Sequence, residues 1–128
     1  MMMKNLVVMA LLLAPSLALA DKDYTGGKGA TWDCAKDATV NINHGQGNYT
    51  FKGACKAINI NGGHNTISVE AVETLDVNGA SNTVTAGSVD TITINGADNK
   101  ITWKKTKGKD GKPAVTTLGQ NNKVSQGK

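Results

Sequence analysis

The sequence predicts an all-β protein, a small single-stranded β-solenoid (β-helix) of about five coils of 17–18 residues each. Three observations predict this fold. Short segments alternate apolar and polar residues and are rich in Val, Ile and Thr, which is typical of strands. An Asn-Gly-x-x-Asn turn separates the two strands in several copies. The whole unit recurs at a nearly constant period, the signature of a repeat architecture.

Each copy has two short strands, and each strand contributes two inward positions. The copies start 18, 17, 17 and 23 residues apart. The inward pairs are Val40/Ile42 with Tyr49/Phe51, Ile58/Ile60 with Ile67/Val69, Leu75/Val77 with Val84/Ala86, Ile92/Ile94 with Ile101/Trp103, and Val115/Thr117 with Val124/Gln126.

Two architectures fit this pattern: the solenoid, and an antiparallel meander or β-sandwich built from hairpins. Cys55, Val72 and Val89 each lie three residues before the next strand pair. A third inward residue in every copy suits a coil with three corners and has no obvious place in a hairpin. We therefore favour the solenoid, in which equivalent residues stack about 4.8 Å apart.

The turns predict a structural ladder, because stacked coils place equivalent turn residues above one another. The last asparagine of the turn recurs in four copies, and we expect these side chains to bond to one another. The first copy departs from the pattern and has His44 and Gly47 in place of Gly and Asn. The expected ladder is Asn65, Asn82, Asn99 and Asn122.

The chain divides into three parts. Residues 1–20 have a basic start, an apolar run and an Ala-x-Ala cleavage site, which predicts a secretory signal peptide. Residues 21–33 are polar and Gly-rich and predict a flexible lead-in, with Trp32 covering one end of the core. Residues 34–128 form the repeat domain. We expect export to the periplasm or the extracellular space. We expect no lipid anchor, because the residue directly after the predicted cleavage site is Asp21 and not a cysteine.

The charge and the cysteine content of the chain limit the classes of function that it can have. The predicted mature chain has 13 Lys, 10 acidic residues and no Arg. The absence of Arg argues against nucleic-acid recognition. Cys34 and Cys55 are the only cysteines, and an even count in an exported chain predicts one disulfide. Such a bond typically contributes about 3 kcal/mol; the alternative is two free thiols.

The order of these features resembles a bacterial exported domain of unknown function, the family numbered 3060. The resemblance is carried by the two cysteines, the repeated Val/Ile-x-Val/Ile-Asn-Gly-x-x-Asn unit, the Ile101-Thr102-Trp103 segment and the final Asn122-x-Val124-x-Gln126. It covers residues 34–126. It implies a small secreted or envelope domain, and it transfers no catalytic residues because the family has no established activity.

The candidate binding site is a loop that interrupts the repeat between Trp103 and Val115. Its charges suit contact with an anionic envelope polymer, a glycan surface or lipid headgroups. A solvated loop that discourages edge pairing is the simpler interpretation and the one we favour. Its lysines are Lys104, Lys105, Lys107, Lys109 and Lys112.

We expect no enzyme, no metal site and no cofactor. Glu73 and Asp90 fall in one column, near the carboxylate spacing of retaining glycosidases, but an outward charge ladder explains them better. His44 and His64 occupy different turn positions, so a zinc site with the cysteines is disfavoured. The expected function is an exported structural or binding module, and a monomer. A fibre or assembly subunit and a carbohydrate-active enzyme are the alternatives.

Overall fold

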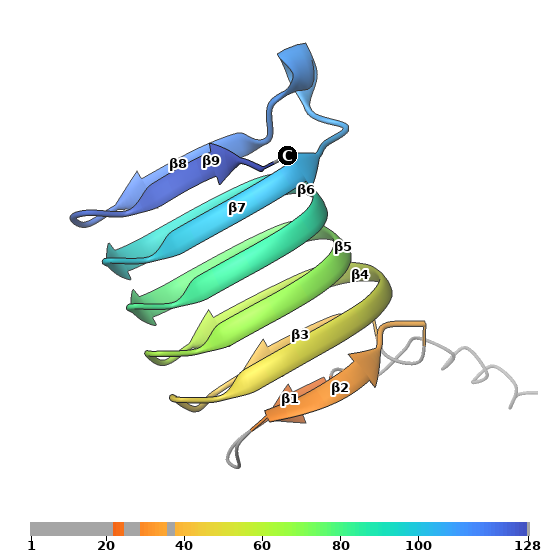
Figure 1. Cartoon of the computed structure of the whole chain (residues 1–128), viewed down its shortest axis with the longest axis vertical. Coiled ribbons are helices and arrows are strands. Elements are labelled where there is room, and N and C mark those ends of the chain that lie inside the picture. The colour runs from red at the N-terminus through yellow and green to blue at the C-terminus, as the bar shows by residue number, and fades with distance from the viewer. Residues whose placement is uncertain (1–21, 25–28, 36–37, 128) are drawn as a thin grey trace, which may run out of the picture.

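The computed structural model describes residues 22–24, 29–35 and 38–127 as a stack of flattened β-coils (Figure 1). The predicted signal peptide, residues 1–20, lies outside the described residues. The elements are β1 (Lys22–Tyr24), β2 (Gly29–Asp33), β3 (Thr39–Ile42), β4 (Asn48–Asn61), β5 (Thr66–Ala80), β6 (Thr83–Ala97), β7 (Lys100–Lys105), the 3-10 turn η3 (Lys109–Gly111), β8 (Ala114–Leu118) and β9 (Lys123–Gln126).

Every strand pair in the described residues is parallel, which confirms the solenoid and excludes the meander. One wall of the stack contains β1, β3, the second halves of β4, β5 and β6, and β8. The other wall contains β2, the first halves of β4, β5 and β6, and β7 and β9. The long strands bend from the second wall into the first, so each coil closes around a thin core.

The core consists of columns of equivalent residues, as the alternating pattern predicts. Tyr49 pairs with Ile67, and the column continues through Val84 and Ile101 to Val124. The bend of the long strands contributes a further inward column, in which Cys55, Val72 and Val89 are all buried. Because each coil buries little surface by itself, its stability depends on the coils above and below.

The structure corrects the expectation of a flexible lead-in at residues 21–33. Residues 22–24 form β1, which pairs with β3, and residues 29–33 form β2, which pairs with β4. The physical reason is the same column rule: Trp32 lies next to Phe51 in register, and Tyr24 next to Ile42. A short extra coil therefore covers the N-terminal end of the stack, and its aromatic side chains pack against the core.

The 18-residue length of the first predicted coil has a local cause. The register between β4 and β5 shifts between Phe51 and Ala54, so that β4 carries one more residue than its partner. Gly53 has a φ of 78° at this bulge, and its N–H donates to Glu70 Oε1 at 2.7 Å. Past this bulge the pairing resumes between Ala54 and Ala71, so the extra residue is confined to the bulge.

Candidate functional site

The asparagines of the turns form a hydrogen-bonded ladder inside the stack. Asn65, Asn82 and Asn99 are buried, with at most 1% of their surface exposed. The Oδ1 of Asn82 accepts the N–H of Asn65 at 3.1 Å, and its Nδ2 donates to the carbonyl oxygen of Gly62 at 2.9 Å. The same bonds recur at Asn99 and end at Asn122. These side chains are fully used by the fold, so the ladder leaves no groups for a ligand.

The turns contain two further columns, one of glycines and one of residues in the left-handed conformation. The turn glycines Gly62, Gly79 and Gly96 have φ between 147° and 152°, and a Cβ there would collide with a carbonyl group of the coil below. The residue before each ladder asparagine lies in the left-handed region, although none of these residues is a glycine. They are His64, Ser81, Asp98 and Asn121, and Gln46, which precedes Gly47 in the turn of the first copy, has the same conformation. The signal was present in the sequence, since Asn, Asp, Ser and His are polar turn residues.

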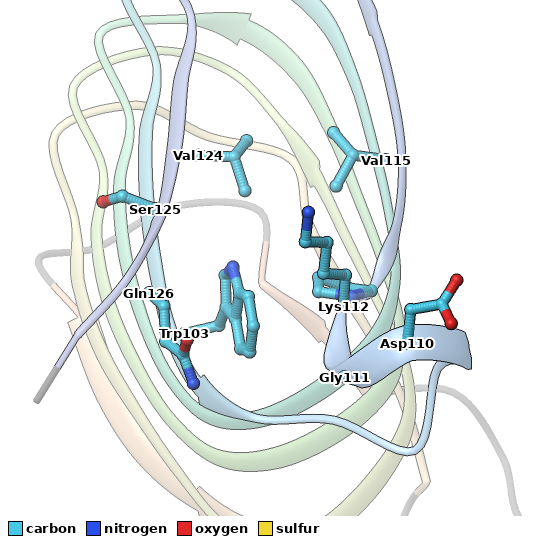
Figure 2. Close-up of a pocket in the computed structure, with 9 residues that line it drawn as sticks. Trp103, Asp110, Gly111, Lys112, Val115, Val124, Ser125 and Gln126 are labelled. Carbon is cyan, nitrogen blue, oxygen red and sulfur yellow. The ribbon is translucent and has the colours of Figure 1, made fainter.

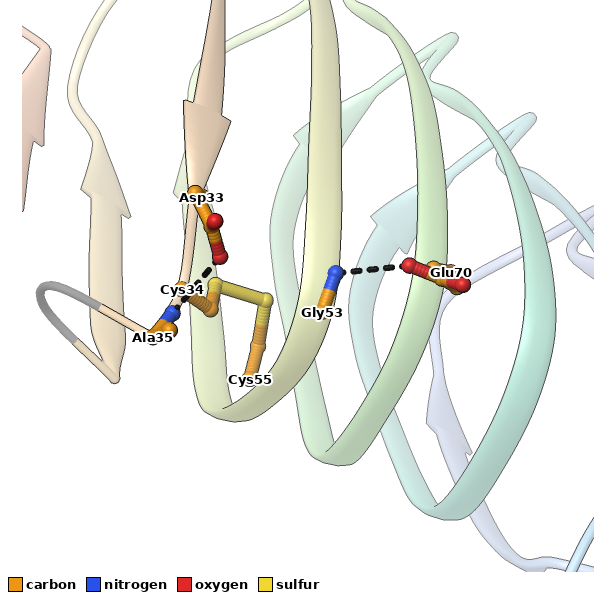
Figure 3. The surroundings of a disulfide bond; sticks show 6 residues. All are labelled: Asp33, Cys34, Ala35, Gly53, Cys55 and Glu70. Atoms are coloured by element: carbon orange, nitrogen blue, oxygen red, sulfur yellow. Dashed lines mark hydrogen bonds between the residues drawn. A yellow bond between two sulfur atoms is a disulfide. The ribbon is translucent and has the colours of Figure 1, made fainter.

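Cys34 and Cys55 form a disulfide that joins the N-terminal coil to the next one (Figure 3). Their Cα atoms are 5.0 Å apart, and both side chains are buried in the column that Val72 continues. The chain around Cys34 is held by the Asp33 carboxylate, whose Oδ1 accepts the N–H of Ala35 at 2.9 Å. The disulfide thus substitutes for apolar packing where the stack begins.

The lysine loop, residues 104–113, replaces the bend of the long strands between β7 and β8. Figure 1 shows it rising from the C-terminal end of the stack, on the side where the lower strands bend. The structure brings all five predicted lysines to this one region, and each is exposed. They are Lys104, Lys105, Lys107, Lys109 and Lys112.

The lysine loop is held to the stack by one hydrogen bond and braced by two hydrogen bonds within itself. The N–H of Lys107 donates to Asp90 Oδ1 at 2.8 Å, and the N–H of Gly108 donates to Thr106 Oγ1 at 2.9 Å. The N–H of Lys112 donates to the Lys109 carbonyl at 3.1 Å. Pro113 is buried where the loop rejoins the stack. The lysine side chains therefore project from a backbone with a defined path.

The open end of the last coil forms a hollow of about 750 Å³, which we call the end hollow (Figure 2). Trp103 lies at its base and is only 6% exposed, while Val115 and Val124 line it from β8 and β9. Lys112 lines the same space, and Gln126 lies beside Trp103. The sequence places Trp103 and Gln126 among the inward positions of the last two copies, but it does not indicate the hollow that they border.

Charge is unevenly distributed along the stack. Residues 98–127 contain seven lysines and two aspartates, whereas residues 54–97 contain one lysine and four acidic residues. The C-terminal end is thus strongly basic and the middle is acidic. An anion approaching the molecule is attracted to the end that carries the lysine loop and repelled by the walls.

The two carboxylates considered for glycan cleavage lie in neighbouring coils, as the register of β5 and β6 requires. Glu73 and Asp90 border a shallow hollow of about 110 Å³ together with Lys107. Asp90 already accepts the Lys107 N–H, so one of the two carboxylates anchors the lysine loop.

Within residues 22–24, 29–35 and 38–127, no cluster of three or more His, Cys, Asp or Glu side chains is placed to hold a metal ion. His44 instead contributes its carbonyl oxygen to the asparagine ladder, where it accepts Asn65 Nδ2 at 2.9 Å. In the same part of the chain, no helix has the length and apolar character that a membrane span requires.

The fold and this site define a small disulfide-bonded β-solenoid with a basic C-terminal end. A family model described as "Protein of unknown function (DUF3060)" matches residues 42–86 and 72–121. The chain therefore belongs to this family, as the resemblance of its motifs indicates. No curated protein matches the chain, and no solved structure matches it.

Proposed function

We propose that this chain is an exported structural or binding module that attaches to an anionic surface of the cell envelope through the lysine loop. The observation that carries the proposal is the gathering of five exposed lysines on one anchored loop, at the basic end of a stack whose middle is acidic. Envelope polymers and lipid headgroups offer the phosphate and carboxylate groups that lysines attract. Export, in turn, rests on the predicted signal peptide and agrees with a buried disulfide.

The proposal is tested by co-sedimentation of the full mature chain with vesicles of an anionic and of a neutral phospholipid, and with a polyanionic glycan. Near an anionic membrane each lysine contributes about 1 kcal/mol. The double variant Lys107→Ser/Lys109→Ser should therefore bind about tenfold or more weakly at low salt, and high salt should abolish binding of the unmodified chain.

A matched control removes two exposed lysines from the walls of the lower coils, as Lys52→Ser/Lys56→Ser. This variant has the same net charge as the loop variant, so net charge by itself predicts equal losses. Equal weakening of the two variants, or binding that is insensitive to salt, would refute a specific role for the lysine loop.

A second candidate function is that of an assembly subunit, favoured by the apolar groups on the last coil. Val115 is 43% exposed and Leu118 is 58% exposed, and no described strand pairs with the outer edges of β8 and β9. Unpaired parallel edges can template further strands. Light scattering during gel filtration over a wide range of concentrations tests this function, because a constant monomer mass excludes it.

A further inference from the structure

The end hollow is a continuation of the core that the protein does not fill. Val115 lies directly above Ile92 and Val124 directly above Ile101, so the two valines extend the inner columns by one step. In the coils below, the residues at the same two positions are covered by the next coil and are buried. An apolar group placed between Val115 and Val124 would therefore contact the same kind of surface that buries the isoleucines beneath.

The low exposure of Trp103 favours an alkyl chain over a flat ring as the ligand of the hollow. A sugar or aromatic ligand normally stacks on a broad exposed aromatic face, but Trp103 is only 6% exposed at the base of the hollow. A volume of about 750 Å³ lies within the range of ordinary small-molecule sites.

The charge of the hollow selects an anionic head group. Figure 2 shows the Lys112 side chain extending toward Val115 and Val124, while the Asp110 carboxylate points away from Trp103. Gln126 Nε2 donates to the Lys104 carbonyl at 3.0 Å, which fixes that side chain beside Trp103. The Lys112 ammonium is the charged group best placed to meet a ligand whose apolar part enters the hollow.

We propose that the end hollow binds a single-chain amphiphile with an anionic head. The chain lies between Val115 and Val124 above Trp103, and the carboxylate or phosphate head pairs with Lys112. This inference deepens the proposed function, on which it rests: the lysine loop attracts an anionic surface, and the hollow receives one acyl chain from it. Both a free fatty acid and a membrane lipid offer this chemistry.

The two tryptophans lie at opposite ends of the stack and allow a direct test. Trp32→Phe leaves Trp103 as the only indole, and among the described residues the Trp32 indole N–H has no hydrogen-bond partner to lose. The full mature chain carrying Trp32→Phe is titrated with octanoate, octyl phosphate, octanol and acetate while Trp103 emission is followed. We expect saturable shifts with octanoate and octyl phosphate, and at least tenfold weaker binding of octanol, which lacks the charge, and acetate, which lacks the chain.

Two pairs of variants locate the site. Lys112→Gln should weaken octanoate binding about tenfold, while the control Lys100→Gln, an exposed lysine of β7 outside the lysine loop and the end hollow, should leave it unchanged. Val124→Ser should also weaken it, while Val69→Ser, in a lower coil, should affect stability only. Circular dichroism before each titration restricts the comparison to folded variants.

The outcomes separate this inference from the proposed function. Vesicle binding that persists without any octanoate response overturns the hollow as a chain site and leaves surface attachment intact. Equal losses from Lys112→Gln and Lys100→Gln overturn the assignment of the head group. A Trp103 shift that depends on protein concentration, with a rise in mass by light scattering, overturns the amphiphile in favour of a second copy of the chain.

Discussion

Replacing Asn82 by Ala tests whether the buried asparagine ladder, rather than apolar packing alone, holds the coils in register. Asn82 has no exposed surface, and its side chain makes three hydrogen bonds. It accepts from the Asn65 N–H at 3.1 Å and donates to the Gly62 carbonyl at 2.9 Å and to Asn99 Oδ1 at 3.1 Å. Alanine removes all three bonds and leaves the Asn65 N–H and the Gly62 carbonyl without these partners.

The expected loss follows from the cost of unpaired buried groups. A buried donor or acceptor left without a partner costs about 1–3 kcal/mol. Two such groups together predict that Asn82→Ala lowers the free energy of unfolding by roughly 3 kcal/mol, a large part of the ~5–15 kcal/mol that stabilises a typical domain. The measurement is urea unfolding with the disulfide intact, followed by circular dichroism, in which the midpoint falls and the slope stays constant.

The same coil supplies the control. Asn78 is exposed and makes one side-chain bond, from its Nδ2 to Asn61 Oδ1 at 3.3 Å, in a ladder on the outer surface. Asn78→Ala should therefore cost less than about 1 kcal/mol. If both variants lose the same small amount, the buried ladder is not a major source of stability, and the apolar columns by themselves set the register.

Three further predictions follow from the turns, the disulfide and the tyrosines. Gly79→Ala should destabilise the chain by at least ~2 kcal/mol, because a Cβ at φ 147° would collide with the Gly62 carbonyl of the preceding coil. Ser81→Gly should instead stabilise the chain by about 1 kcal/mol, because glycine adopts the left-handed conformation that the serine has at φ 60° without strain. Thermal midpoints of the two variants that move in the same direction would contradict this reasoning. Cys34→Ser/Cys55→Ser should lower the free energy of unfolding by about 3 kcal/mol and should increase amide hydrogen exchange first in β1 and β2. Unchanged exchange in β1 and β2 would show that the disulfide does not hold the first coil to the stack. Burial raises the pKa of Tyr49 above its ordinary value of 10.0, so the unfolded state ionises first as pH rises and stability should decline once the pH exceeds about 10. Tyr49→Phe should flatten this decline in urea midpoints measured across that pH range.

The sequence predicted the coils, the inner columns and the ladder because each coil repeats the same short-range constraints. Alternation with period two assigned the faces of each strand, and the constant spacing of Asn65, Asn82 and Asn99 aligned them. Cys55, Val72 and Val89 revealed the bend because a third apolar position recurs at the same offset. Because the unit is repeated, the same coil geometry could be predicted independently from several copies.

The features that occur once were harder to predict. The N-terminal coil has no Asn-Gly turn and few apolar residues, so its pairing with β3 and β4 depends on the long-range packing of Tyr24 and Trp32. The end hollow depends on how the lysine loop folds back at Pro113, which no periodicity specifies. The five lysines were visible in the sequence, but their relation to Trp103 was not.

The difference between the repeated middle coils and the two ends of the stack also bears on function. In the middle coils, the inward side chains, the ladder asparagines and the strand edges are all satisfied by the coils above and below, so identical coils have little left with which to bind a partner. The two ends break that symmetry, and they are closed differently. At the N-terminal end, aromatic rings and a disulfide cover the core, and Lys22 lies 4.4 Å from the centre of the Trp32 ring. At the C-terminal end, the exposed Val115 and the partly buried Val124 line the end hollow beside the lysine loop, so the proposed site for an apolar chain lies where the attraction of anions is strongest.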